Sequence, residues 1–162
     1  KMGMALLLTM RGIPQMYYGT EILMKNFSNP DGLVRSDFPG GWDGDKKNKF
    51  IADGRTNKEN EAFNFVKTLA NYRKNSAALQ TGKLMQFVPE DDIYVYFRYN
   101  AQPKGTVMVI SNNTEKEKTL NTDRFAERTN GITTAKNIIN NETVSFKEIK
   151  VPAKTTLVLE LN

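Results

Sequence analysis

The hydrophobic pattern of the chain changes its period near residue 80. Residues 2–10 are apolar almost throughout and predict a buried helix. Apolar side chains between residues 62 and 73 recur three and four positions apart, which predicts a second helix with one buried face. Further along, polar and apolar positions alternate with a period of two, as they do in strands. We therefore expect a first part at 1–79 and a β part at 83–162.

The second predicted helix carries signals for both of its ends. Thr56 and Glu59 have the spacing of a capping box, in which each side chain accepts a hydrogen bond from the backbone amide of the other residue. Asn75 and Ser76 interrupt the apolar pattern and are expected to end the helix.

The segment between the two helices predicts a strand and a loop. Gly12 suits the position just after a helix, where a positive φ has no steric cost for glycine. Residues 13–18 are apolar and aromatic and predict a short strand buried on both faces, as in a parallel sheet. Residues 19–57 are rich in Gly, Asn and Asp and read as one long loop. A loop of that length in a compact domain usually has a function.

The β part is expected to be an antiparallel sandwich built from short strands. A helical turn is expected near 122–127. The predicted strands cover residues 93–99, 106–110, 136–139, 143–146 and 155–161, with turns at 111–114 and 140–141.

The composition limits the partners and the kinds of reactive group that we expect for this chain. Of the 162 residues, 39% are hydrophobic and 25% are charged, which is typical of a folded domain. The net charge of +5 comes from dispersed residues, so neither nucleic acid nor a membrane is an expected partner. The chain has no Cys and no His, which excludes disulfides, cysteine nucleophiles and a histidine base from these residues.

Two sequence segments resemble a known family. Residues 11–21, RGIPQMYYGTE, resemble the last barrel strand of the α-amylase family, glycoside hydrolase family 13. Residues 31–42, DGLVRSDFPGGW, are similar to the branch that holds cyclomaltodextrinases and neopullulanases. The resemblance implies an α/β barrel fragment at 1–79, made of the last helix, eighth strand, loop and eighth helix of a TIM barrel. An all-β antiparallel sandwich, the family's domain C, would follow at 83–162.

The resemblance also implies an activity for a longer protein. Members of the family cleave α-1,4-glucosidic bonds in maltodextrins, cyclodextrins or pullulan with retention, using two carboxyl groups at the cleaved bond. Those carboxylates would lie upstream of Lys1, so we expect this piece to contain no catalytic residue and to be inactive alone. Two other readings remain open: a non-catalytic carbohydrate-binding or scaffolding module, and a transglycosylase or isomerase of the same family.

The resemblance places substrate-binding residues in the long loop. Asp31 and Arg35 have the spacing of an Asp and an Arg that bind sugar hydroxyls in the family; an exposed ion pair of little consequence is the alternative. Trp42 is the only tryptophan and is expected either to stack on a glucose ring or to anchor the loop by packing. Of the adjacent Tyr17 and Tyr18, Tyr18 is expected to be better placed to reach the bound sugar. Glu21 is expected to accept bonds from loop amides.

The remaining expectations concern partners and metals. The substrate would be an α-glucan oligosaccharide, and the fragment would self-associate through exposed barrel surfaces. A tyrosine stripe at Tyr94, Tyr96 and Tyr99 is a weaker candidate for sugar binding than for packing. Residues 43–45 lack the later glutamate of a calcium loop, so no metal site and no cofactor are expected; any calcium ligands of a longer protein would lie outside this chain. The branch it resembles favours a periplasmic location slightly over a cytoplasmic one.

Overall fold

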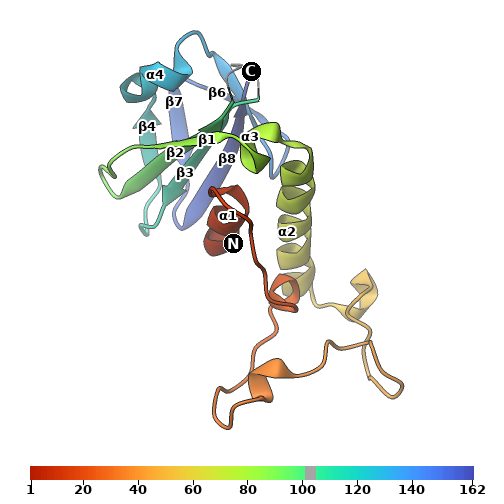
Figure 1. Ribbon diagram of the computed structural model, residues 1–162. Helices are drawn as coiled ribbons and strands as arrows, with labels where there is room; N and C mark the ends of the chain where they lie inside the picture. The colour runs from red at the N-terminus through yellow and green to blue at the C-terminus, as the bar shows by residue number, and fades with distance from the viewer. Residues whose placement is uncertain (101–104) are drawn as a thin grey trace. The chain divides into compact units, whose positions relative to one another are not determined.

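The computed structural model describes residues 1–100 and 105–162, which pack as two compact units (Figure 1). The β unit combines residues 1–14 with residues 68–162. The loop unit comprises residues 15–67. The division differs from the boundary near residue 80 that the sequence suggests, because the first helix and the end of the long helix pack with the strands.

The β unit contains two antiparallel sheets, in agreement with the predicted antiparallel sandwich, but the strands at 83–86, 118–121 and 148–151 are not among those that the sequence predicts. The six-stranded sheet has the order β1-β2-β3-β8-β5-β6, and the second sheet pairs β4 with β7. The strands are β1 (Lys83–Gln86), β2 (Ile93–Tyr99), β3 (Val107–Asn112), β4 (Lys118–Asn121), β5 (Thr134–Asn137), β6 (Thr143–Ser145), β7 (Glu148–Val151) and β8 (Thr155–Leu161).

One strand is longer than its sequence indicates. The polar run that begins at Ser111 predicts a turn, but β3 continues through Ser111 and Asn112. Both side chains find polar partners inside the fold. The Ser111 hydroxyl lies 2.9 Å from that of Thr156, and the Asn112 amide donates to the carbonyl oxygens of Val151 and Pro152. Paired polar groups are stable when buried, so polarity alone does not end the strand here.

The main hydrophobic core lies on one face of the six-stranded sheet. Phe97 in β2 pairs with Met108 in β3, which pairs with Leu159 in β8, and all three side chains are fully buried. Phe125 adds an aromatic side chain from the short helical segment between β4 and β5. That segment, η4 (Asp123–Phe125) followed by α4 (Ala126–Thr129), confirms the predicted helical turn.

The tyrosines of β2 mainly pack, which is the role that the sequence favours for them. Tyr96 is fully buried, and its hydroxyl lies 2.5 Å from the hydroxyl of Thr9 in α1 (Met2–Thr9). Burial raises the pKa of Tyr96 to about 12. Tyr99 packs against the main core, with the Arg128 guanidinium 3.9 Å from the centre of its ring. Tyr94 is half-buried, so the three tyrosines do not form one exposed surface.

Arg98 connects the face of β2 that carries Tyr96 to two other elements. Its guanidinium is fully buried and donates to the Thr9 and Met10 carbonyl oxygens, both at 2.8 Å, at the end of α1. It also donates to the carbonyl oxygens of Leu79, in α3 (Ala77–Gln80), at 3.0 Å and of Gly82 at 3.2 Å. The guanidinium thus binds four carbonyl oxygens, three of them in buried contacts and the Met10 oxygen in a partly buried one.

Arg73 binds the same end of α1. Its guanidinium donates to the Leu8 carbonyl oxygen at 2.9 Å and to the Gly12 carbonyl oxygen at 2.7 Å. It shares the Met10 carbonyl with Arg98, at a longer distance of 3.4 Å. Cations at the C-terminal end of a helix are stabilised by the unpaired carbonyl groups there.

Residues 13–18 do not form the predicted strand. They have no regular secondary structure, and the side chain of Ile13 is 97% exposed. A strand exists only when another backbone pairs with it, and a strand of a parallel barrel needs a neighbour on each side. The described residues supply no such neighbour. The αβ half-unit expected at the start of the chain is therefore absent here, although α1 itself and the positive φ of Gly12 are present.

The loop unit is largely irregular, as its composition predicts. Its only regular elements before the long helix α2 (Asn57–Asn75) are three short 3-10 helices, η1 (Thr20–Ile22), η2 (Leu33–Arg35) and η3 (Ala52–Gly54). The capping box is confirmed, because the Thr56 amide donates to the Glu59 carboxylate at 2.8 Å and the Glu59 amide donates to the Thr56 hydroxyl at 3.3 Å. The helix ends at Asn75, as expected.

Candidate functional site

The candidate site lies in the loop unit and starts from an exposed ion pair. Asp31 and Arg35 are joined by a 2.5 Å contact across η2, with side chains that are 74% and 56% exposed. Gly32 begins that turn with a φ of 108°, which suits glycine and brings the fourth residue back beside the first. The pair offers a carboxylate and a planar guanidinium to the solvent side by side, and both are suited to binding neighbouring hydroxyl groups.

Tyr18 is distant from this pair in the sequence but contacts the residue that follows it. Its hydroxyl donates to the carbonyl oxygen of Ser36, the residue after Arg35, at 3.0 Å. Partial desolvation raises the pKa of the Tyr18 hydroxyl, and the neighbouring Tyr17 ring, 4.7 Å away between centroids, adds to the effect. Tyr18 is therefore a neutral hydrogen-bonding group on the same surface as the ion pair.

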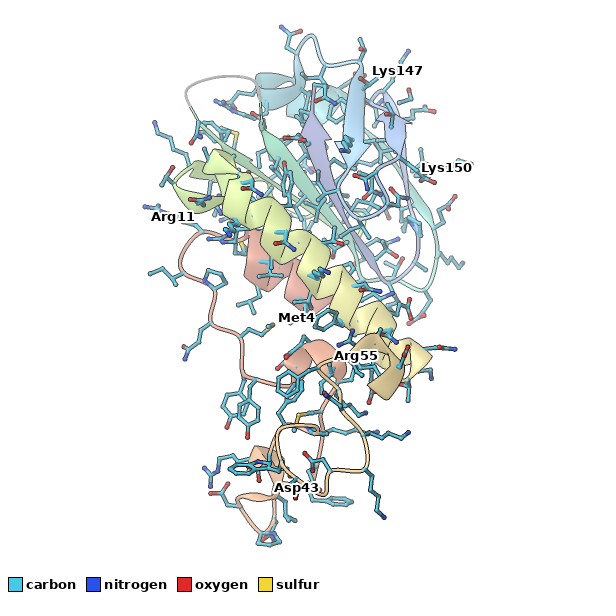
Figure 2. The ribbon with its side chains drawn as sticks, turned by 90° about the vertical axis from the view of Figure 1, so that its right-hand side faces the viewer. Met4, Arg11, Asp43, Arg55, Lys147 and Lys150 are labelled. Carbon is cyan, nitrogen blue, oxygen red and sulfur yellow. The ribbon has the colours of Figure 1, made fainter. Side chains whose placement is uncertain are left out.

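Trp42 sits on a separate loop with bonds of its own. Its side chain is 67% exposed, and its backbone amide donates to the Asp45 carboxylate at 3.1 Å. Within the described residues Trp42 is exposed, and both roles that the sequence leaves open for it, stacking on a sugar and anchoring the loop by packing, stay predictions. Figure 2 shows that the neighbouring Asp43 lies toward one end of the loop unit, while Arg55 lies beside the start of α2.

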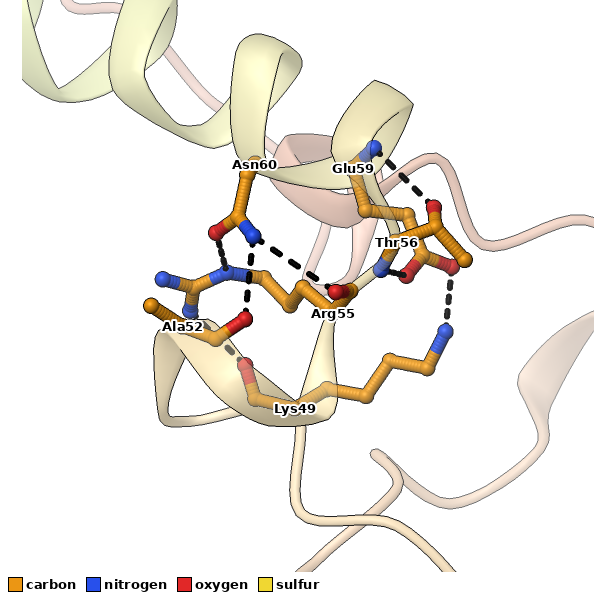
Figure 3. A network of polar contacts seen from close by, with 6 residues as sticks. All are labelled: Lys49, Ala52, Arg55, Thr56, Glu59 and Asn60. Atoms are coloured by element: carbon orange, nitrogen blue, oxygen red, sulfur yellow. Dashed lines mark hydrogen bonds and ion pairs between the residues drawn. The ribbon is translucent and has the colours of Figure 1, made fainter.

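Arg55 anchors the end of the long loop to the first turn of α2 (Figure 3). Its guanidinium donates to the carbonyl oxygens of Lys49, at 2.9 Å, and Phe50, at 3.2 Å, and to the Asn60 side chain at 2.8 Å. The same guanidinium lies 3.9 Å from the centre of the Phe63 ring. One side chain thus fixes the loop backbone and packs on the helix.

Glu59 adds a charged contact to this network. Its carboxylate forms an ion pair with Lys49 and caps the Thr56 amide, and both charged side chains are only 17% exposed. The Lys49 hydrogen bond first, and then the Thr56 amide, lower the pKa of the Glu59 carboxyl group. The ion pair between Glu59 and Lys49 in Figure 3 therefore depends on Glu59 being ionised.

We expect the loop anchor to weaken in acid. A carboxyl group whose pKa is lowered on folding contributes stability above its unfolded pKa, near 4.5, and that contribution is lost as the pH falls through the folded value. Glu59→Gln keeps an acceptor for the cap but removes the charge, so it should be less stable than the wild type at pH 7 and nearly equal to it at pH 3. Urea unfolding at the two pH values measures the difference. An equal gap at both values would show that the charge of Glu59 contributes nothing.

Glu21 does not have the amide partners that its sequence position suggests. One oxygen of its carboxylate is buried and has no hydrogen-bond partner among the described residues.

The described residues contain no group of three or more acidic side chains that is placed to hold a metal ion. No described helix combines the length and apolar character that a membrane span requires.

The structure joins some predicted site residues and adds others. Asp31 contacts Arg35, and Tyr18 contacts Ser36, the residue after Arg35. Trp42 instead makes its contacts within residues 38–50. Sequence reasoning missed Asp45, whose signal is its position three residues after Trp42 in a loop rich in glycine. The assignment of Asp31, Arg35, Trp42 and Tyr18 to sugar binding stays a prediction.

Comparison with known proteins identifies the relatives of the chain. Residues 84–160 match the family described as the Cyclo-malto-dextrinase C-terminal domain. The cyclomaltodextrin glucanotransferase of Klebsiella oxytoca is 33% identical over 162 residues, which are 99% of this chain and 22% of that protein. Alpha-amylase 3 of Dictyoglomus thermophilum is 28% identical over 130 residues, which are 70% of this chain and 25% of that protein.

A solved structure supports the same relationship at the level of the fold. The alpha-amylase of Geobacillus thermoleovorans, in complex with acarbose, superposes with a TM-score of 0.69 and 21% identity over 98% of this chain and 32% of that chain. This chain thus spans about a quarter or less of the length of the two curated relatives. Residues 84–160 belong to the cyclo-malto-dextrinase C-terminal domain family, and the chain as a whole is similar to cyclomaltodextrin glucanotransferases and alpha-amylases.

Proposed function

We propose that this chain works as the C-terminal part of a retaining enzyme that acts on α-1,4-linked glucans such as maltodextrins, cyclodextrins or pullulan. The catalytic carboxylates would be supplied by residues outside this chain. The loop unit would contribute substrate contacts, and the β unit would serve as domain C. The observation that carries the proposal is the exposed Asp31–Arg35 pair on a long ordered loop, in a chain whose C-terminal half belongs to this family.

The exposed apolar side chains of the loop unit support the proposal that another part of the complete protein covers them. Leu23, Phe27 and Phe50 are between 52% and 78% exposed, and Ile13, just before the loop unit, is 97% exposed. Large apolar side chains gathered in one segment are usually covered in the working protein. We infer that the rest of a TIM barrel covers them, and that residues 13–18 pair as its eighth strand when those neighbours are present.

Asp31, Arg35 and Tyr18 would each make a different kind of contact with a bound sugar. The Asp31 carboxylate accepts hydrogen bonds from hydroxyl groups, and the Arg35 guanidinium donates to their oxygens. Tyr18, whose hydroxyl already donates to Ser36, would accept from the sugar or contact it with its ring. Trp42 would offer a flat apolar face to a glucose ring.

Transglycosylation is the second candidate reaction. The Klebsiella relative is a cyclomaltodextrin glucanotransferase, whereas the Dictyoglomus relative is an alpha-amylase. Transfer and hydrolysis differ in whether a sugar hydroxyl or water attacks the covalent intermediate. Product analysis of the complete enzyme separates them, because only transfer yields products longer than, or cyclised from, the starting glucan.

Asp31→Ala and Arg35→Ala test the proposed site. Each substitution in the complete enzyme should raise KM for a maltooligosaccharide about tenfold, since a charged hydrogen bond to a sugar contributes about 1.5 kcal/mol or more. The double variant should lose less than the sum, because the two side chains contact each other. Lys47→Ala, an exposed residue of the same loop, is the control and should leave KM unchanged. Unchanged KM values in both single variants would remove the site from the proposal.

A further inference from the structure

The segment 38–50 forms a loop that is closed at its base. The rings of Phe38 and Phe50 lie 4.5 Å apart between centroids, and the Lys49 amide donates to the Pro39 carbonyl oxygen at 2.9 Å. Gly40 has a φ of +104°, and a Cβ built there would lie 2.5 Å from the Asn48 Cα, so no other residue fits without displacing the backbone. The two ends of this loop are therefore held together by the packing of the two rings and by backbone contacts.

Asp45 fixes the tip of this loop. A single carboxylate oxygen, Oδ2, accepts from the Gly40 amide at 2.7 Å and from the Trp42 amide at 3.1 Å. The Asp45 amide in turn donates to the Trp42 carbonyl oxygen at 3.2 Å. Both backbone polar groups of Trp42 are thereby bound to one residue, which holds the backbone while the ring remains 67% exposed.

An exposed aromatic ring on a fixed backbone is suited to binding. A tryptophan on a mobile loop would have to lose conformational freedom when it binds a ligand, whereas a backbone that is already held loses less. A solvent-exposed indole also presents the flat apolar surface on which a sugar ring packs. Asp45 thus makes the loop rigid at the point where rigidity increases affinity.

We propose that Asp45 is a positioning residue, which holds Trp42 as a stacking platform for a glucose unit of the α-glucan. This inference rests on the proposed function and deepens it, because it names the residue that orients one of the contacts. In this proposal Asp45 does not itself contact the sugar. Its effect on binding is transmitted through the backbone of Trp42.

Four variants of the complete enzyme test the proposal. Asp45→Ala should raise KM for a maltooligosaccharide about three- to tenfold and leave kcat within about twofold, because it removes binding that is equal in the ground and transition states. Asp45→Asn should restore most of the affinity, since the amide oxygen can accept from the same backbone amides. Asp43→Ala is the matched control: it removes an exposed carboxylate two residues away and should leave KM unchanged. Trp42→Ala should raise KM at least as much as Asp45→Ala.

The decisive measurement is the double variant. If Asp45 acts only through Trp42, Asp45→Ala adds nothing to KM once Trp42 is already alanine. An equal increase of KM in the presence and absence of Trp42, or an unchanged KM for Asp45→Ala alone, would overturn the inference. If Asp31→Ala and Arg35→Ala raise KM while the Asp45 and Trp42 variants do not, only this inference fails. If none of the four positions affects KM, the proposed function fails with it.

Discussion

Replacing Arg98 by methionine should lower the free energy of unfolding of the β unit by about 3–5 kcal/mol. Methionine fills a similar volume with an unbranched side chain but donates no hydrogen bond. The four carbonyl oxygens that Arg98 binds would each lose a partner, and three of them lie in buried contacts. A buried acceptor without a partner costs about 1–3 kcal/mol. Arg73 can relieve only one of them, the Met10 carbonyl, to which it already donates at 3.4 Å.

The position of Arg98 explains why the expected loss is so large. The guanidinium lies at the C-terminal end of α1, where the free carbonyl groups stabilise a cation. Burial, and next the charge of Arg73, lower the pKa of Arg98, so the charged form is already at a disadvantage that the four hydrogen bonds offset. Removing the side chain loses those bonds and weakens the attachment of α1 and α3 to β2, although the Tyr96–Thr9 contact between β2 and α1 remains.

Urea unfolding monitored by circular dichroism measures the Arg98→Met effect. Lys150→Ala is the control, because Lys150 is an exposed cation on β7 and its loss should change stability by no more than about 0.5 kcal/mol. A loss below about 1 kcal/mol for Arg98→Met would mean that water or other groups satisfy the four carbonyls. The hydrogen bonds of Arg98 between β2 and the end of α1 would then contribute little to stability.

The sequence predicts the local features of this fold well. The capping box at Thr56 and Glu59 depends only on residues three positions apart, so spacing suffices to find it. The two faces of β2 follow from a period of two, and the strand β8 has the predicted bounds. Elements that depend on neighbouring residues in the chain are accessible to pattern reasoning.

The features that sequence reasoning missed depend on distant partners. Arg98 lies on a strand face where an arginine is normally solvated, and its acceptors come from segments 16 to 89 residues away. Residues 13–18 have the composition of a buried strand, but pairing needs a second backbone. Asp45 reads as one charge among several in a polar loop, and only the fold of that loop brings both amides to one oxygen. Composition and spacing do not encode these contacts.

The site residues fall between these two cases. Asp31 and Arg35 are four positions apart, and the turn of η2 brings them together as the spacing suggests. Trp42 was found because it is the only tryptophan, but its exposure could not be read from the sequence. Whether an aromatic side chain packs or faces solvent depends on the neighbours that the fold places around it, whereas the bonds from Asp45 fix only the backbone of Trp42.

Phe97→Ala should destabilise the β unit by about 3–5 kcal/mol, through a mechanism different from that of Arg98. Phe97 is fully buried in the middle of β2 and contacts the rings of Phe87 and Phe125, at centroid distances of 5.8 and 6.0 Å. Alanine removes the ring and leaves a cavity, because the flanking strands are fixed by their hydrogen bonds and cannot close it. Phe97→Leu should cost less, since a branched side chain fills part of the space.

The measurement for Phe97 needs a probe from the β unit. Trp42 is already exposed in the folded chain, so its fluorescence should change little on unfolding, whereas the buried Tyr96 gives a near-ultraviolet circular dichroism signal. Val88→Ala is the control, because Val88 is 76% exposed in the same unit and its truncation should change stability by no more than about 0.5 kcal/mol. If Phe97→Ala and Val88→Ala behaved alike, the ring of Phe97 would be reached by solvent. The position of the main core on this face of the six-stranded sheet would then have to be reassigned.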